Sequence, residues 1–129
     1  MVVYITRRFK FDAAHHLPYY DGKCHNIHGH TYHLDVTIGG VPIREPSNPK
    51  CGMVMDFHDL NTLVKSLVID KYDHQDLNQF FGNPTAEVMV QEIAKTIGTN
   101  LPHDNGAEDI FLQSVKLWET EDSYAEWVR

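Results

Sequence analysis

Apolar and polar residues alternate along two long segments near the start of the chain, and this period of two predicts β-strands. The first segment, residues 2–15, places Phe9 on the same face as His15. The second, residues 30–38, starts at His30 and keeps its apolar side chains on the face of that histidine. If the strands pair as antiparallel neighbours, histidines near their adjoining ends lie close together in apolar surroundings.

Two later segments repeat their apolar residues at helical spacing. Residues 57–69 predict an amphipathic helix, for which Asp56 suits the N-cap position. The second helix is expected to start at residues 83–85, where Asn or Thr can cap it and Pro fits the first turn. Its apolar stripe continues to Gly98, which we expect to end it.

The remaining segments complete an α+β domain. Residues 39–52 are rich in turn formers and predict an exposed connection, followed by a short strand at residues 53–55. Residues 109–118 predict a last strand, with Phe111 on the same face as Val115. The length of 129 residues fits one domain that spans the whole chain, with an antiparallel sheet and two helices on one of its faces.

Composition and charge exclude several classes of function. The formal net charge of −7 opposes binding to the phosphate backbone of a nucleic acid. No apolar run reaches the roughly 18 residues that a membrane-spanning helix needs, and the first residues lack the pattern of a signal peptide. We therefore expect a cytoplasmic protein that binds neither nucleic acid nor membrane, with Cys24 and Cys51 as free thiols.

The candidate chemistry starts with a histidine pair. His28 and His30 are two residues apart, so in an extended chain they project from the same face, and strand pairing brings His15 towards them. Burying imidazoles without partners is costly, and coordination satisfies their lone pairs at once. Three nitrogen ligands leave zinc one open position, as in catalytic sites, although imidazoles suit iron as well. His16 points to the other face and is not counted as a ligand.

Four other features each allow two interpretations. Cys24 is an inert small residue unless a metal or an imidazolium favours its thiolate. Asp73 and His74 are either a solvated helix end or a proton relay. Glu119 either caps the sheet in water or accepts two parallel N–H bonds from a guanine-like or pterin edge. Glu87 is best interpreted as complementing a helix dipole.

Six motifs of the chain, in one order from Phe11 to about Thr120, resemble those of the 6-pyruvoyltetrahydropterin synthase family. The motifs are Phe11-Asp-Ala-Ala-His15, Cys24-x3-His28-Gly-His30, Met55-Asp-Phe57, Asp73-His74-x2-Leu77-Asn78, Asn83-Pro-Thr-x-Glu87 and Glu119-Thr120. The spacing between Cys24 and His28 is similar to that of the bacterial 6-carboxy-5,6,7,8-tetrahydropterin synthases of queuosine biosynthesis.

The resemblance implies a tunnelling fold, in which a four-stranded antiparallel sheet has two helices packed on one face. Three such subunits close a barrel and two trimers stack, so that a homo-oligomer is expected and exposed sheet edges disappear. The implied zinc ligands are His15, His28 and His30. The implied catalytic relay is Cys24, Asp73 and His74, and the implied substrate contacts are Glu119, Thr85 and Glu87.

The activity implied by the resemblance is a zinc-dependent conversion of 7,8-dihydroneopterin triphosphate to 6-carboxy-5,6,7,8-tetrahydropterin, with release of triphosphate and acetaldehyde. A 6-pyruvoyltetrahydropterin synthase, which releases no acetaldehyde, is the nearest alternative. A cupin is a further one, because Gly22-x5-His28-x-His30 imitates part of its first motif, but Asp35 stands where cupins need Glu. A non-catalytic metal-binding protein is a third alternative.

Overall fold

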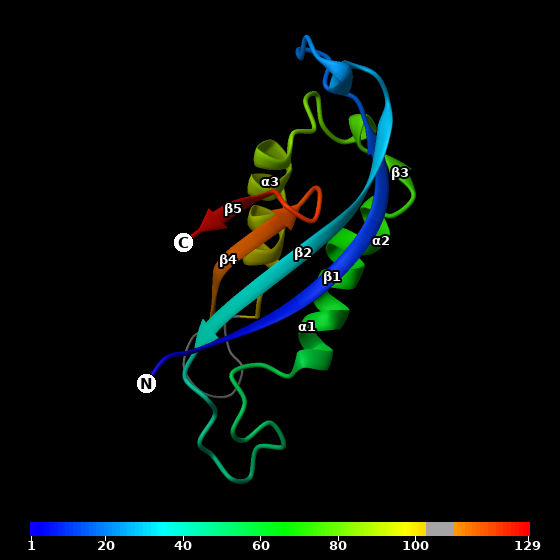
Figure 1. Cartoon of the computed structure of the whole chain (residues 1–129). Helices are drawn as coiled ribbons and strands as arrows, with labels where there is room; N and C mark the ends of the chain where they lie inside the picture. The colour runs from blue at the N-terminus through cyan, green and yellow to red at the C-terminus, as the bar shows by residue number, and fades with distance from the viewer. Residues whose placement is uncertain (103–109) are drawn as a thin grey trace.

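Residues 1–102 and 110–129 are described by a computed structural model, in which helices cover one face of a five-stranded sheet (Figure 1). The strand order is β3-β1-β2-β4-β5, so the sheet is open with β3 and β5 at its edges. All pairings are antiparallel except the parallel pairing of β1 with β3. The strands are β1 (Val3–His15), β2 (His28–Gly40), β3 (Gln75–Asp76), β4 (Phe111–Trp118) and β5 (Tyr124–Val128).

The helices lie behind the sheet in the view of Figure 1. The Asp56 side chain caps the first helix by accepting a hydrogen bond from the His58 N–H, and Thr85 caps the last by accepting one from the Val88 N–H. Their bounds are α1 (Phe57–Val64), a π-helical turn (Lys65–Ile69), α2 (Asp70–Tyr72) and α3 (Ala86–Asn100). Two 3₁₀ turns cover Lys23–His25 and Leu77–Gln79.

The two long strands follow the predicted alternation. Along β1, Phe9, Phe11 and Ala13 are buried while the residues between them face solvent or are half-buried. β2 starts two residues before the predicted boundary and ends two residues after it, at Gly40. The register pairs His15 with His28, which brings the predicted metal ligands to one end of the sheet.

The core lies between the buried face of the sheet and the helices. Leu34 of β2 and Ile93 of α3 are both fully buried, and both belong to this core. Phe11 and Tyr32 stack with ring centroids 5.0 Å apart. Tyr32 also meets the edge of His30 at 5.6 Å, so the aromatic part of the core supports the histidines directly.

Several predicted boundaries are wrong. The helix predicted at residues 57–69 continues as a helical segment to Tyr72 through the π-helical turn. The second helix ends at Asn100 instead of Gly98. Residues 53–55 form no strand: the Ile43 N–H donates to the Met53 carbonyl oxygen within the loop, and Val54 and Met55 are buried there.

The sheet has five strands and not the four that the resemblance implied. β3 and β5 are short edge strands that the sequence analysis missed. The register of β4 against β2 shifts between Thr37 and Ile38, so Leu112 is buried together with Val115 and the predicted placement of Phe111 on that face is wrong. The predicted start of this strand, Asp109, lies outside the described residues.

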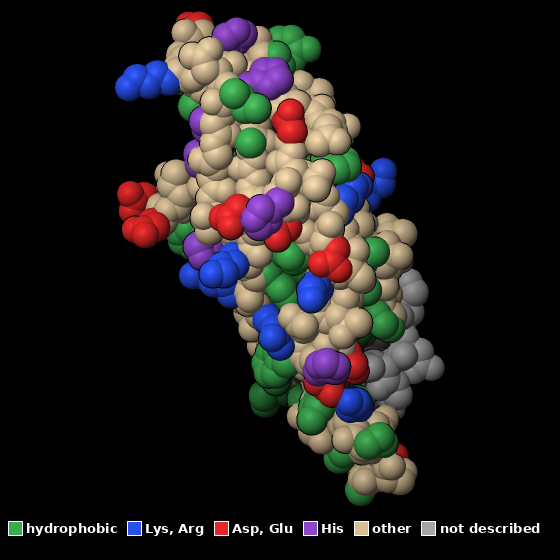
Figure 2. Space-filling view, turned by 90° about the vertical axis from the view of Figure 1, so that its right-hand side faces the viewer, with side chains coloured by type: hydrophobic (Ala, Val, Ile, Leu, Met, Phe, Trp, Pro, Cys, Tyr) green, Lys and Arg blue, Asp and Glu red, His purple; other side chains and the backbone are tan. Residues whose placement is uncertain are grey.

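Charged side chains of both signs are mixed on the surface. On the face drawn in Figure 2, Lys and Arg side chains are interspersed with acidic ones and form no continuous basic stripe. Within the described part of the chain, no helix has the length and apolar character needed to cross a membrane.

Candidate metal centre and substrate pocket

Three histidines meet on the buried face of the sheet, at the end where β1 stops and β2 starts. The antiparallel register places His28 opposite His15 and His30 opposite Ala13. The three ring centroids lie 4.7, 4.8 and 5.1 Å apart. His15 is only 1% exposed, which makes it the one buried polar side chain of the described residues. The predicted convergence of the imidazoles is therefore observed, while their binding of a metal stays a prediction.

Backbone carbonyls determine which ring nitrogens face the centre. His15 Nδ1 lies 2.8 Å from the Pro84 carbonyl oxygen, and His28 Nδ1 lies 2.8 Å from that of Asn26. A carbonyl oxygen only accepts, so each Nδ1 must donate and each neutral ring presents an Nε2 lone pair to the centre. These two Nε2 atoms are 3.1 Å apart. Two facing lone pairs at this distance repel each other, and a cation between them removes the conflict.

Glu119 brings a carboxylate to the same point from the end of β4. Its Oε1 lies 2.9 Å from His30 Nε2 and 3.4 Å from His15 Nε2. The geometry does not allow a hydrogen bond to His30 Nε2, which is buried without a hydrogen-bond partner among the described residues. The ligand atoms of the four residues lie within 4.8 Å of one another. A ring nitrogen that is buried and unpartnered beside a carboxylate is the expected arrangement of a site built for a cation.

The electrostatics favour a neutral His30 ring beside a charged Glu119 carboxylate. Burial lowers the pKa of His30, although the charge of Glu119 acts in the opposite direction. The pKa of the Glu119 carboxyl also lies below its ordinary value, chiefly because of its contact with the His15 ring, while burial acts in the opposite direction. Neutral imidazoles and an ionised carboxylate are the protonation states that a divalent ion requires. The residues therefore fit the metal that the sequence analysis predicted.

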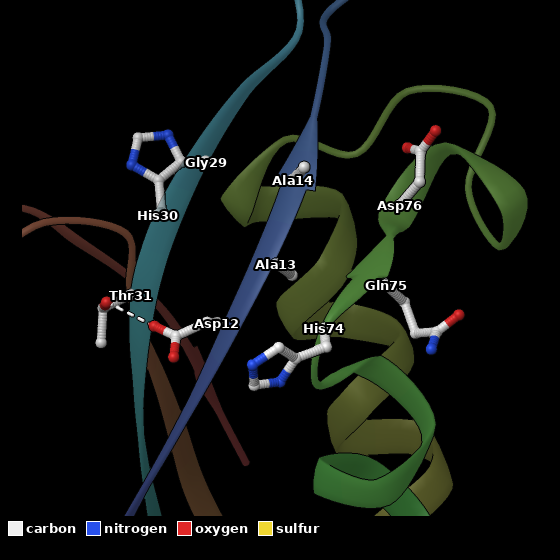
Figure 3. A pocket seen from close by; sticks show the side chains of 9 residues that line it. All are labelled: Asp12, Ala13, Ala14, Gly29, His30, Thr31, His74, Gln75 and Asp76. Carbon is white, nitrogen blue, oxygen red and sulfur yellow. Dashed lines mark hydrogen bonds between the residues drawn. The ribbon is translucent and has the colours of Figure 1, made fainter.

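A pocket of about 550 Å³ has one residue of this cluster, His30, in its lining. Its lining combines residues of β1, β2 and the segment around β3, as drawn in Figure 3: Asp12, Ala13, Ala14, Gly29, His30, Thr31, His74, Gln75 and Asp76. The volume suits a small molecule. In Figure 3 the His74 ring lies beside Asp12, whereas the His30 ring points away from both. His30 and His74 both border this pocket. Asp12 and Thr31 alternate along their strands with the residues on the histidine face, so the pocket lies mainly on the face of the sheet opposite to the three imidazoles.

The predicted pair Asp73–His74 is anchored to β1. The Asp12 N–H donates to Asp73 Oδ1 at 3.0 Å, and the His74 N–H donates to the Asp12 carbonyl oxygen at 2.6 Å. Asp73 Oδ1 also lies 3.0 Å from His74 Nδ1. The backbone bond from Asp12 and the bond from His74 lower the pKa of the Asp73 carboxyl. His74 has a φ of 61°, a conformation that is costly for a residue with a Cβ and that occurs preferentially at functional sites.

Cys24 lies in the connection between β1 and β2, which extends beyond the sheet at the top of Figure 1. It is half-buried, and both cysteines are free thiols, as expected. Its carbonyl accepts from the Leu17 N–H, but in the described part of the chain its thiol makes no hydrogen bond to His74 or to the metal cluster. Within one chain, the structure therefore does not bring the three predicted catalytic residues into contact.

The remaining predicted substrate residues lie at the start of α3. Thr85 acts as the N-cap, and Glu87 is exposed in the first turn, where its charge complements the helix dipole. The sequence analysis missed the contribution of this segment to the metal cluster, which comes from the Pro84 carbonyl. It also missed Asp12, which lies with Asp73 and His74 in a second group of possible metal ligands. Only the fold reveals contacts made by backbone atoms.

Comparison with known proteins agrees with this site. The family model described as 6-pyruvoyl tetrahydropterin synthase matches residues 4–129. The 6-carboxy-5,6,7,8-tetrahydropterin synthase of Haemophilus influenzae is 39% identical, covering 95% of this chain and 96% of that protein. The dihydroneopterin monophosphate aldolase of Pyrococcus furiosus is 36% identical, covering 89% of this chain and 88% of that protein.

Solved structures give the same fold. The 6-pyruvoyl tetrahydropterin synthase of Caenorhabditis elegans has a TM-score of 0.79 and 27% identity, and the match covers 100% of this chain and 96% of that one. The chain therefore belongs to the 6-pyruvoyl tetrahydropterin synthase family. The cupin alternative is wrong, because a cupin is almost all strand and this chain has long helices packed on its sheet.

Proposed function

We propose that this chain is a zinc-dependent lyase that converts 7,8-dihydroneopterin triphosphate to 6-carboxy-5,6,7,8-tetrahydropterin, releasing triphosphate and acetaldehyde, in queuosine biosynthesis. The observation that supports this most is the convergence of three imidazoles and the Glu119 carboxylate, whose ligand atoms lie within 4.8 Å of one another. The name of the Haemophilus influenzae relative supports the same product.

His15, His28 and His30 would hold the metal ion. When bound there, a divalent ion lowers the pKa of substrate hydroxyls and stabilises negative charge on their oxygens. The protein contributes the orientation of the rings, because the Pro84 and Asn26 carbonyls hold two of them with Nε2 towards the centre.

Cys24, Asp73 and His74 would move the protons. As a thiolate, Cys24 removes a proton from the side-chain carbon next to the pterin ring, and His74 returns protons elsewhere on the side chain. Asp73 holds His74 through Nδ1 at 3.0 Å, which leaves Nε2 free to exchange a proton. Elimination expels triphosphate, and retro-aldol cleavage with water then expels acetaldehyde and leaves the carboxylate on C6. No redox cofactor is needed, because the electrons are rearranged within the substrate.

Glu119, Thr85 and Glu87 would bind the pterin. The Glu119 carboxylate can accept two parallel N–H bonds from the amidine-like edge of the ring and so sets its position relative to the metal. The Thr85 hydroxyl accepts from the Val88 N–H at 3.2 Å and keeps its own proton for a ligand. Glu87 is exposed next to it.

We further propose that the chain is one domain that works as a homo-oligomer, a trimer or a hexamer. The open edges at β3 and β5 support this, because pairing between copies would close the sheet into a barrel and satisfy the unpaired edge groups. Association would also allow the Cys24 thiol of one copy to meet a relay from another. Two free cysteines fit a cytoplasmic location. The molar mass of the native protein in solution tests the assembly.

The deciding experiment supplies 7,8-dihydroneopterin triphosphate to the purified, zinc-loaded protein. We expect release of triphosphate and acetaldehyde in equal amounts and a product with the mass of the carboxypterin. Triphosphate without acetaldehyde would instead indicate a 6-pyruvoyltetrahydropterin synthase. No release of triphosphate would refute the proposal and favour a non-catalytic metal-binding protein.

A second candidate rests on the relative from Pyrococcus furiosus, which is named a dihydroneopterin monophosphate aldolase. Retro-aldol cleavage is common to both activities, and the same metal cluster could support it. Parallel assays with dihydroneopterin monophosphate and with the triphosphate separate the two candidates. Cleavage of the monophosphate alone would favour the aldolase.

A further inference from the structure

We propose that Glu119 has two alternating roles: it is the fourth ligand of the metal in the resting protein, and it leaves the metal to bind the pterin when substrate arrives. This inference rests on the proposed function, because it requires a metal on the three histidines. It adds a ligand to a site in which three histidines alone leave one position open.

The distances between the donor atoms support direct coordination. With bonds of about 2.0–2.1 Å, a tetrahedral zinc ion separates its ligand atoms by about 3.3 Å. Glu119 Oε1 lies 2.9 Å from His30 Nε2 and 3.4 Å from His15 Nε2. The Nε2 atoms of His15 and His28 are 3.1 Å apart. The carboxylate oxygen therefore lies at about the spacing of a fourth ligand from two of the imidazoles, and all four donors lie within 4.8 Å of one another.

The surroundings of Glu119 hold its carboxylate at this place. The residue directly follows β4, and its N–H donates to the Ser123 carbonyl at 3.2 Å, which closes the turn into β5. Its side chain is 26% exposed, less than that of a solvated turn residue. In addition, His30 Nε2 has no hydrogen-bond partner within the described residues, so the contact at 2.9 Å is not explained by a hydrogen bond.

The two roles must alternate, because they need the same oxygen atoms. A carboxylate that accepts two parallel N–H bonds from a pterin uses both oxygens for the ring. Oε1 cannot do so while it is a metal ligand at the position observed. Departure of Glu119 opens a coordination position at the moment when the side-chain hydroxyls of the substrate come into reach. Until then, the closed shell keeps solvent from that position.

Metal affinity and the visible spectrum of the cobalt-substituted protein test the proposal without depending on turnover. The variants are Glu119→Gln, which keeps the size and removes the charge, and Glu119→Asp, which keeps the charge but shortens the side chain. Glu121→Gln serves as the matched control, because Glu121 is exposed and only two residues away. The probe ligand is 7,8-dihydroneopterin, which lacks the triphosphate leaving group. Circular dichroism confirms that each variant is folded.

We expect both Glu119 variants to bind zinc about tenfold more weakly or worse, and their cobalt spectra to differ from that of the parent before any pterin is added. In the parent, 7,8-dihydroneopterin should change the cobalt spectrum as the carboxylate leaves. Glu121→Gln should match the parent in both measurements. If Glu119→Gln and Glu119→Asp keep the parent affinity and resting spectrum, the coordination role is overturned. A parent protein that binds no zinc would instead refute the proposed function itself.

Discussion

The Pro84 carbonyl oxygen lies 2.8 Å from His15 Nδ1, although the two residues are 69 positions apart in the chain. This contact links the residue before the N-cap of α3 to the histidine cluster and selects the ring tautomer whose Nε2 faces the centre. The Tyr32 hydroxyl lies 3.3 Å from the same Nδ1. The segment predicted to line the pterin pocket therefore also orients a predicted metal ligand. The predicted substrate-binding segment and the predicted metal ligands are thus connected through Pro84.

Replacing His28 by Ala should remove most of the bound zinc. The substitution deletes one of the converging nitrogens, and the two remaining imidazoles bind a divalent ion far more weakly. Zinc content after dialysis against a weak chelator measures the effect. His33→Ala is the matched control, because His33 is on β2 but on the opposite face of the sheet, and it should retain its zinc. Full zinc retention in His28→Ala would show that the ligands are assigned wrongly.

Replacing Cys24 by Ala should abolish turnover while the protein stays zinc-loaded. The thiol is proposed to remove a substrate proton, and it makes no contact with the three histidines among the described residues. Loss of a general base lowers the rate by a factor of about 10²–10⁴. Cys51→Ala, the other free thiol, should leave both rate and zinc content unchanged. Equal rates for the two variants would contradict the role of Cys24.

Replacing His74 by Gly or by Ala should abolish activity in both cases but change the stability of the protein by different amounts. The residue has a φ of 61°, which glycine adopts freely and alanine does not. We expect His74→Gly to exceed His74→Ala by about 1 kcal/mol in free energy of unfolding, because only alanine retains the steric cost. Both variants should be inactive, since neither exchanges protons. Urea denaturation measures the difference, and an alanine variant as stable as the glycine variant would show that the backbone is not strained there.

The pair Arg8–Asp35 should make stability depend on pH in acid. Arg8 donates to both Asp35 oxygens at 2.7 and 2.9 Å, and Trp118 Nε1 donates at 3.0 Å. Chiefly through the Arg8 bond, the pKa of Asp35 lies below its ordinary 3.8. A depressed pKa stabilises the fold above the unfolded-state value, and this contribution is lost as the pH falls through the folded-state value.

The parent protein should therefore be more stable than Asp35→Asn by a constant amount between about pH 5 and 7, and this advantage should shrink below about pH 4. Denaturation curves in chelating buffer measure it, so that loss of metal in acid does not contribute. Asp21→Asn, at an exposed position, is the control and should show no such dependence. An advantage that persists unchanged into strong acid would mean that the ion pair is not its source.

The alternation of side chains was enough to predict that the three histidines converge. In β1 and β2 the period of two assigns each residue to a face, so the placement of His15, His28 and His30 on the apolar side followed from residue type and spacing alone. The two principal helices were predicted for the same reason, because their apolar stripes and capping residues are local signals. Their ends were not, since the π-helical turn and the extension to Asn100 depend on packing.

Contacts between segments that are distant in the chain depend on the tertiary fold. β3 has only two residues, too few to show a period, and in β5 apolar side chains occur on both faces. The bulge in β4 moves Phe111 from the predicted face without any local signal. The Pro84 carbonyl and the Asp12 backbone have no side-chain signature either. Sequence patterns encode which face a residue occupies, whereas the approach of Glu119 to the histidines results from how β4 is packed beside β2.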